Sequence, residues 1–164
     1  MIDIVLVPRQ RLGVLIGAEG KTKKEIEKRT KTHITVAEEV VIEGEALDVL
    51  KTKEIVRAIG RGFSPEKAFH LLSEDYQLYI ITMEGEKPNT VKRIFARIIG
   101  KGGRTREKIE QDTECFVSVF GKTVSIIGKT EDLPKAADAV EFLLSGKSHS
   151  FVYGRLEHSK NKME

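Results

Sequence analysis

The stretch Ile98-Ile99-Gly100-Lys101-Gly102-Gly103-Arg104-Thr105 decides the fold, because a related stretch, Leu15-Ile16-Gly17-Ala18-Glu19-Gly20-Lys21-Thr22, stands near the start of the chain. In both, two apolar residues lead into Gly-x-x-Gly, and a basic, helix-forming run follows. Glycine allows the backbone to turn tightly between two helices and to come close to a ligand. A helix that begins after the turn directs N–H groups and a positive dipole end at that ligand. We therefore expect each stretch to be a turn suited to grip a phosphate.

The repeat extends well beyond the glycines. A shift of 83 positions places Gly17, Gly20, Thr22, Ile26, Glu27 and Thr30 on Gly100, Gly103, Thr105, Ile109, Glu110 and Thr113. Further along, the shift becomes 84 and Gly44 falls on Gly128, which indicates one inserted residue in a hairpin turn, where insertions are tolerated. Because the repeat unit is about half of the chain, the sequence predicts two related domains rather than a solenoid.

The composition excludes several classes of protein. Of the 164 residues, 40% are hydrophobic and 32% are charged, which is typical of globular domains. No run approaches the roughly 20 apolar residues that span a bilayer, and residues 1–5 contain no basic leader, so we expect a cytoplasmic protein without membrane contact. A single cysteine and four scattered histidines have no metal-ligand spacing, so we expect no metal and no cofactor.

Apolar periodicity and turn residues predict the order β-α-α-β-β-α in each half. Strands are expected at 4–7, 34–36, 40–42, 78–81, 116–120 and 123–127, and helices at 9–16, 22–29, 45–59, 64–72, 89–99, 105–112 and 133–144. We expect a first domain over 1–73 that includes a bridging helix at 64–72, a second over 74–145, and a C-terminal tail over 146–164. The inward residues of helix 45–59 are expected to be Leu47, Leu50, Val56 and Ile59. Asn89 is expected to cap helix 89–99, and Phe151, Val152, Tyr153 and Leu156 of the tail could dock on the second domain.

The net charge of the chain is only +3, but its positive charges form a local cluster. Around the second glycine turn stand Arg97, Lys101, Arg104, Arg106 and Lys108, with Glu107 the one acid among them. The first turn contains Glu19, which would repel a phosphate, although Lys21, Lys23 and Lys24 follow it. Local clusters matter more than the total when a phosphate must be held. The second turn is therefore expected to dominate binding. For the first turn, a role in packing or protein contact stays open beside RNA binding.

The element order, with Gly-x-x-Gly between the first two helices, resembles the type I KH domain. The resemblance implies an α+β fold of two tandem type I KH domains, each a three-stranded antiparallel sheet packed by helices. Such domains clamp about four nucleotides of single-stranded nucleic acid with the glycine loop and an apolar groove. The RNA-binding residues that it implies are Gly100, Lys101, Gly102, Gly103, Arg97, Arg104 and Arg106, groove residues Ile98, Ile99, Ile109, Val117 and Val119, and, in the first domain, Gly17, Gly20 and Lys21.

Two further points concern that resemblance. Base edges would be read by backbone groups near 116–118, and the alternative that the groove aliphatics are plain core stays open. The chain also departs from most KH domains three residues past the last glycine, where Lys23 and Arg106 stand in place of an aliphatic residue.

The chain resembles the archaeal members of the rRNA-processing KH family in five segments: 97–106, 109–110, 119–128, 143–149 and 152–153. These are relatives of the eukaryotic partner-of-NOB ribosome-assembly family. The resemblance implies binding to small-subunit rRNA near its 3′ end during ribosome assembly or pre-rRNA processing. It further implies contact with the alpha subunit of archaeal translation initiation factor two.

Three other functions are alternatives to single-stranded RNA binding. A KH regulator of mRNA, a KH-fold protein-interaction scaffold with weak RNA binding, and a nuclease or methyltransferase accessory remain alternatives. The triplet Gly121-Lys122-Thr123 is similar to the end of a P-loop, but Phe116 occupies the position where that motif requires glycine. We therefore expect a hairpin turn at this triplet, no catalytic residues and no enzymatic activity.

Overall fold

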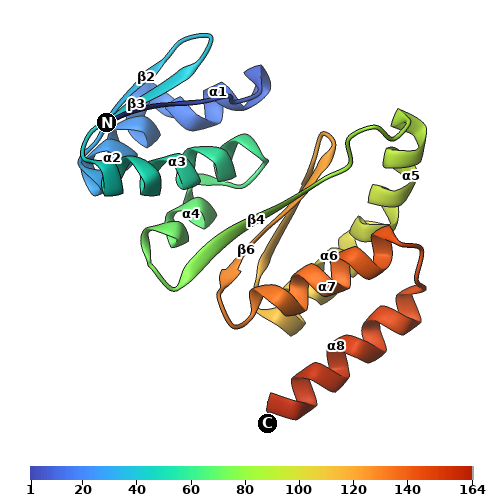
Figure 1. Cartoon of the computed structure of the whole chain (residues 1–164). Helices are drawn as coiled ribbons and strands as arrows, with labels where there is room; N and C mark the ends of the chain where they lie inside the picture. Colours follow the sequence, from blue (N-terminus) through green and yellow to red (C-terminus); the bar gives the residue numbers. More distant parts are fainter. Residues whose placement is uncertain (164) are drawn as a thin grey trace. The chain divides into compact units, whose positions relative to one another are not determined.

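The computed structural model describes residues 1–163, with side chains through residue 160. The chain divides into two compact units, of which unit 1 is Met1–Tyr76 and unit 2 begins at Gln77. Each unit contains one three-stranded sheet and several helices, as Figure 1 shows. The order β-α-α-β-β-α occurs in both, which confirms the expected α+β class.

Unit 1 forms its sheet in the order β1-β3-β2 with antiparallel neighbours. Strand β1 begins two residues earlier than expected, because Ile2 pairs with Glu43 of β3. The expected helix 64–72 is two short helices, and Ser64 caps the first by accepting a hydrogen bond from the Lys67 N–H at 3.3 Å. The elements are β1 Ile2–Val5, α1 Arg9–Ile16, η1 Ala18–Gly20, α2 Lys21–Thr30, β2 His33–Val36, β3 Val40–Glu43, α3 Ala46–Gly60, α4 Pro65–Ala68 and η2 Phe69–Leu72.

The inward face of α3 agrees with the prediction at Val56 and Ile59, which are buried, and differs from it at the other two residues. Leu47 and Leu50 are exposed, at 80% and 49% of their surface, whereas Val49, Thr52 and Ile55 are buried. Two apolar stripes at helical spacing run along this helix, one through Leu47 and Leu50 and one through Val49, Thr52, Val56 and Ile59. The sheet packs against the second stripe, although this stripe contains a threonine.

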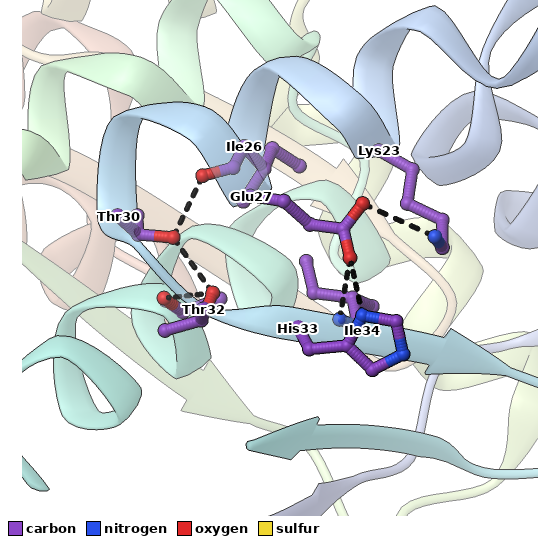
Figure 2. A network of polar contacts seen from close by, with 8 residues as sticks. Lys23, Ile26, Glu27, Thr30, Thr32, His33 and Ile34 are labelled. Atoms are coloured by element: carbon purple, nitrogen blue, oxygen red, sulfur yellow. Dashed lines mark hydrogen bonds and ion pairs between the residues drawn. The ribbon is translucent and has the colours of Figure 1, made fainter. Parts of the chain in front are cut away.

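Thr52 is buried, and its hydroxyl belongs to a polar network whose members Thr30 and Thr32 are labelled in Figure 2. Thr30 donates to the Ile26 carbonyl at 2.7 Å and contacts the Thr32 hydroxyl at 2.7 Å. Thr32 contacts the Thr52 hydroxyl at 3.1 Å, and Thr52 donates to the Asp48 carbonyl at 2.7 Å. Buried hydroxyls that are all bonded avoid the cost of lost hydration, so this network joins α2, the residue before β2 and α3 without that cost.

Unit 2 repeats the topology with sheet order β4-β6-β5. Its core includes Phe95, Ile98, Ile109, Val117, Ile126 and Leu143. The elements are β4 Tyr76–Thr82, α5 Pro88–Ile99, η3 Lys101–Gly103, α6 Arg104–Thr113, β5 Phe116–Phe120, β6 Thr123–Lys129, α7 Leu133–Leu144 and α8 His149–Met163. Asn89 was wrongly expected to cap α5. Lys87 is the N-cap and Pro88 the first helical residue, where the fixed φ of proline favours a helix start.

The one-residue difference between the repeats lies in the hairpin turn, as expected. Val36 pairs with Val40 in unit 1, and the matching Val119 pairs with Val124 in unit 2. Three residues separate the first pair and four separate the second, and the longer turn closes on Phe120 paired with Thr123. The Gly121-Lys122-Thr123 triplet is thus the turn and start of a strand, not a phosphate-binding loop.

The residues expected to form a tail contain helix α8, which packs along α6 and α7 (Figure 1). Val152 and Leu156 are buried in the core of unit 2, whereas Phe151 is exposed. Val152 and Leu156, which are four positions apart, thus give α8 a docked face. None of the helices in the described part of the chain combines the length and apolar character needed to cross a bilayer.

Candidate nucleic-acid interface

The two glycine turns have the same backbone conformation. Gly17 and Gly100 have φ of 75° and 77° with ψ of 173° and 172°, and Gly20 and Gly103 have φ of 76° and 80°. In each turn the first glycine N–H donates to a carbonyl of the preceding helix at 2.9 Å, and the last glycine N–H donates to the first glycine carbonyl at 3.1 Å. Each repeat therefore forms the same turn from its own local hydrogen bonds.

The first glycine of each turn cannot be replaced without a collision. A Cβ on Gly17 would lie 2.8 Å from the Thr22 backbone nitrogen, and one on Gly100 would lie 2.7 Å from that of Thr105, with the threonine hydroxyl closer still. The backbone region that these glycines occupy is also nearly restricted to glycine. By contrast, Gly102 and Gly103 have open space where a Cβ would stand.

The two turns differ in the charge of their middle residues. Glu19 and Gly102 hold equivalent left-handed positions, with φ of 56° and 63°. In unit 2, Lys101 and Arg104 are exposed beside the glycines. In unit 1, Glu19 is exposed there, with Lys21 exposed at the start of α2. Helix α6 begins at Arg104, so its positive end adds to the two cations. Unit 2 therefore presents the more favourable surface to a phosphate.

Fewer residues can line the expected apolar groove than the sequence predicts. Ile98 and Ile109 are completely buried, and Val117 is 2% exposed, so all three are core residues. Ile99, at the end of α5, is 36% exposed, and Val119 on β5 is half-buried. Ile99 and Val119 are thus the two of the five predicted groove residues that a ligand can reach.

Arg97 is held by hydrogen bonds within the protein, and Arg106 lies only within ion-pair distance of a glutamate. Arg97 donates to the Lys147 carbonyl at 2.7 Å and to the Leu143 carbonyl at 3.5 Å, which places its guanidinium at the end of α7. Arg106 lies 3.7 Å from Glu110, one helical turn away. The exposed cations Lys101 and Arg104 therefore stay the stronger predictions for phosphate contact.

Helix α8 contacts both sides of the second glycine turn, which sequence reasoning missed. The Tyr153 hydroxyl lies 3.0 Å from the Thr105 hydroxyl, and His149 Nε2 lies 2.9 Å from the Arg97 carbonyl. The two α8 rings also stack on each other, with centroids 6.1 Å apart. Thr105 was visible as a repeat position, but nothing in the pattern pointed to residues almost 50 positions further along the chain.

A glutamate on the helix after each turn binds the backbone of the neighbouring edge strand. Glu27 accepts a hydrogen bond from the Ile34 N–H at 2.8 Å, and Glu110 accepts one from the Val117 N–H at 3.0 Å. Figure 2 shows that Glu27 also contacts Lys23 at 3.1 Å and His33 at 3.2 Å. The repeat paired Glu27 with Glu110, but the sequence did not predict what either does.

We expect unit 1 to lose stability in acid because of Glu27. Burial alone would raise the pKa of its carboxyl, but the Ile34 N–H and the Lys23 ammonium outweigh it and leave the pKa below the ordinary 4.5. A carboxyl with a lowered pKa stabilises the folded state above its ordinary value, and this contribution is lost as the pH falls through the folded pKa. Chemical denaturation of wild type and Glu27→Gln at pH 7 and at pH 3 should therefore give a smaller acid-induced drop in the variant.

The Cys115 thiol is buried. Burial raises its pKa to about 11, so it stays protonated at neutral pH. It is 2% exposed and packs in the core of unit 2. A thiol in this state is a small apolar residue rather than a nucleophile.

Both units match models of known domain families. The model for the eukaryotic-type KH domain, KH-domain type I, as found in the second domain of PNO1 proteins, matches residues 77–161. The general KH-domain model matches residues 2–58. The chain belongs to the KH-domain family. The match to the PNO1 model reaches through α8 almost to the end of the chain, so this helix belongs to the matched domain.

Relatives place the chain near the Dim2 and PNO1 proteins. The KH domain-containing protein MJ0443 of Methanocaldococcus jannaschii is 43% identical over 99% of this chain and 76% of its own length. The RNA-binding protein pno-1 of Caenorhabditis briggsae is 33% identical over 70% of this chain. This chain spans less than half of that eukaryotic relative, 44% of its length.

A solved structure extends the comparison to three dimensions. A chain from the crystal structure of the a/eIF2alpha-aDim2p-rRNA complex of Pyrococcus horikoshii OT3 is 46% identical to this one. The two superpose with a TM-score of 0.92 over 99% of this chain and 95% of the other. The likeness therefore includes both units and their helices.

Proposed function

We propose that this chain binds single-stranded RNA through the second glycine turn and the surface beside it, and that it does so without catalysis. One observation supports this best: the glycine turn presents two exposed cations, Lys101 and Arg104, at the start of α6. Such a turn suits a sugar-phosphate backbone. Ile99 and Val119 offer apolar surface to unstacked bases, which a duplex would hide.

Unit 1 has the secondary part in this proposal. Its turn has the same geometry, but Glu19 stands where unit 2 has Gly102. Gly17, Gly20 and Lys21 would then add flanking affinity rather than specificity. One tetranucleotide bound to unit 2 would carry most of the recognition.

The target that we propose is small-subunit rRNA, near its 3′ end, during ribosome assembly or pre-rRNA processing in the cytoplasm. A relative from Aspergillus fumigatus, 32% identical over 70% of this chain, is a pre-rRNA-processing protein pno1. The similar Pyrococcus horikoshii protein occurs in a complex with rRNA and a/eIF2alpha, so we propose the alpha subunit of initiation factor two as a protein partner here. Protection confined to mRNA in a footprint from cells would instead favour the mRNA regulator.

One observation favours a second candidate function, protein contact by unit 1. Ile2 and Ile4, alternate residues of β1 that share one face of the strand, expose 63% and 50% of their surfaces. Apolar residues exposed on one face can mark a protein interaction site. A scaffold that uses this surface would bind RNA weakly and with little dependence on salt.

We expect a moderate salt dependence that separates these two candidates. Lys101, Arg104 and their neighbours offer roughly three to five phosphate contacts, and each contributes about −0.7 to the log–log slope for a single strand. Anisotropy titrations of a labelled single-stranded RNA at several KCl concentrations should give a slope of roughly −2 to −4. The same RNA annealed to its complement should bind more weakly. A slope near zero, or tighter binding of the duplex, would contradict the proposed function.

A further inference from the structure

The free edge of strand β5 offers a short row of backbone groups to a ligand. Strand β5 lies at the end of the sheet, paired on one side with β6. In an antiparallel strand, successive residues direct their N–H and C=O groups alternately to the two sides. The Val117 N–H meets Glu110 rather than β6, so Val117 and Val119 are the residues whose backbone groups point outward.

Glu110 changes what this edge can bind. Its Oε2 accepts the Val117 N–H at 3.0 Å, so that donor is occupied. The groups that remain at the edge are the Val117 carbonyl, the Val119 N–H and carbonyl, and the carboxylate itself. The expectation that backbone groups near 116–118 read base edges is therefore incomplete, because a side-chain carboxylate occupies the middle of that row.

The corresponding carboxylate in unit 1 has more partners. Glu27 binds Lys23 through Oε1 at 3.1 Å, and Ile34 and His33 through Oε2 at 2.8 and 3.2 Å (Figure 2). In unit 2, Arg106 lies 3.7 Å from Glu110 Oε1, beyond hydrogen-bond distance. Phe116, whose side chain carries no hydrogen-bonding group, stands where unit 1 has His33. The two glutamates are almost equally exposed, at 19% and 17%, so the difference lies in their partners.

We propose that Glu110 reads the base seated against the β5 edge and selects guanine there, an inference that rests on the proposed RNA binding of unit 2. A carboxylate accepts only, and it accepts best from two donors side by side. Guanine presents such a pair, N1–H and the N2 amino group, on its Watson–Crick edge. Adenine and cytosine present one amino group beside an acceptor nitrogen, and uracil places its N3–H between two carbonyls that a carboxylate repels.

The test is a selection from a short randomised single-stranded RNA pool on the full-length protein, followed by affinities for single RNAs. Wild type should enrich guanine at one position. Inosine there, which lacks only the N2 amino group, should weaken binding about tenfold. Glu110→Gln should lose the preference, because the amide exchanges one acceptor for a donor while its oxygen can still accept the Val117 N–H. Glu27→Gln is the matched control and should leave the preference unchanged.

Each outcome bears on the inference. RNA binding by wild type without a guanine position, or equal affinity for the guanine and inosine RNAs, would overturn it without reference to any variant. An unchanged guanine preference in a folded Glu110→Gln protein would overturn it too. If wild type bound none of the RNAs, the proposed function would fail first and this inference with it.

Discussion

Reversing the charge of the second glycine turn is expected to weaken RNA binding about 100-fold. The variant Lys101→Asp with Gly102→Glu removes one exposed cation and places two carboxylates beside the phosphate path. Hydrogen bonds to charged groups contribute about 1.5–3 kcal/mol each, and about 1.4 kcal/mol corresponds to a tenfold change in affinity. The backbone can accept the change, because Glu19 already holds the equivalent left-handed position in unit 1. Anisotropy titration at fixed salt measures the effect.

Unit 1 provides the matched control for this variant. Ala18→Asp gives its turn the same four residues, Gly-Asp-Glu-Gly, in the same backbone conformation. We expect a loss of about threefold or less, since this turn contains an acid already. Circular dichroism melts should show both variants folded. Equal losses from the two variants would contradict the asymmetry between the units.

Replacing Gly100 by alanine is expected to destabilise unit 2 by about 3 kcal/mol or more. The residue has φ of 77° and ψ of 172°, a region that costs other residues of order 1–3 kcal/mol. The added Cβ would also lie 2.7 Å from the Thr105 nitrogen, so the start of α6 must shift, and overpacking of this kind costs about 1–3 kcal/mol more. Denaturant unfolding followed by circular dichroism measures the loss.

Gly103→Ala separates the collision from the backbone preference. Gly103 has φ of 80° and open space at its Cβ position, so only the left-handed conformation is penalised. We expect a cost of about 1–2 kcal/mol, clearly below that of Gly100→Ala. Similar costs for the two substitutions would mean that the contact with Thr105 relaxes freely.

The features that the sequence predicted are those written in local pattern. The two glycine turns, the strand pairs and the hairpin insertion follow from residues that repeat at a fixed shift, and local turn chemistry has few solutions. The inward face of α3 failed because Leu47–Leu50 and Val49–Thr52 are both stripes at helical spacing. Which stripe is buried depends on the sheet and on hydroxyl partners from α2 and β2, which no local pattern reveals.

The candidate site was predicted in the same uneven way. The turn at Gly100–Gly103 was predicted because its conformation depends on local sequence, and its role in RNA binding stays a prediction. Ile98 is buried and Ile99 is exposed, although the two are adjacent in sequence and equally apolar. Glu110, Tyr153 and His149 act through partners distant in sequence or through the strand backbone, so their roles required the folded chain.

The threonine network of unit 1 bears on how duplicated halves diverge. Thr30, Thr32 and Thr52 correspond to Thr113, Cys115 and Ala136 in unit 2, where Thr113 still donates to the Ile109 carbonyl at 2.6 Å. The two cores solve one packing problem with different residues, and the solutions do not mix freely. Thr52→Ala alone would leave the Thr32 hydroxyl with Thr30 as its remaining hydroxyl partner, whereas the pair Thr32→Cys with Thr52→Ala imports the other half's arrangement as a set. Substitutions inside this cluster are therefore expected to be non-additive, because the cost of each one depends on which of the other hydroxyls is still present.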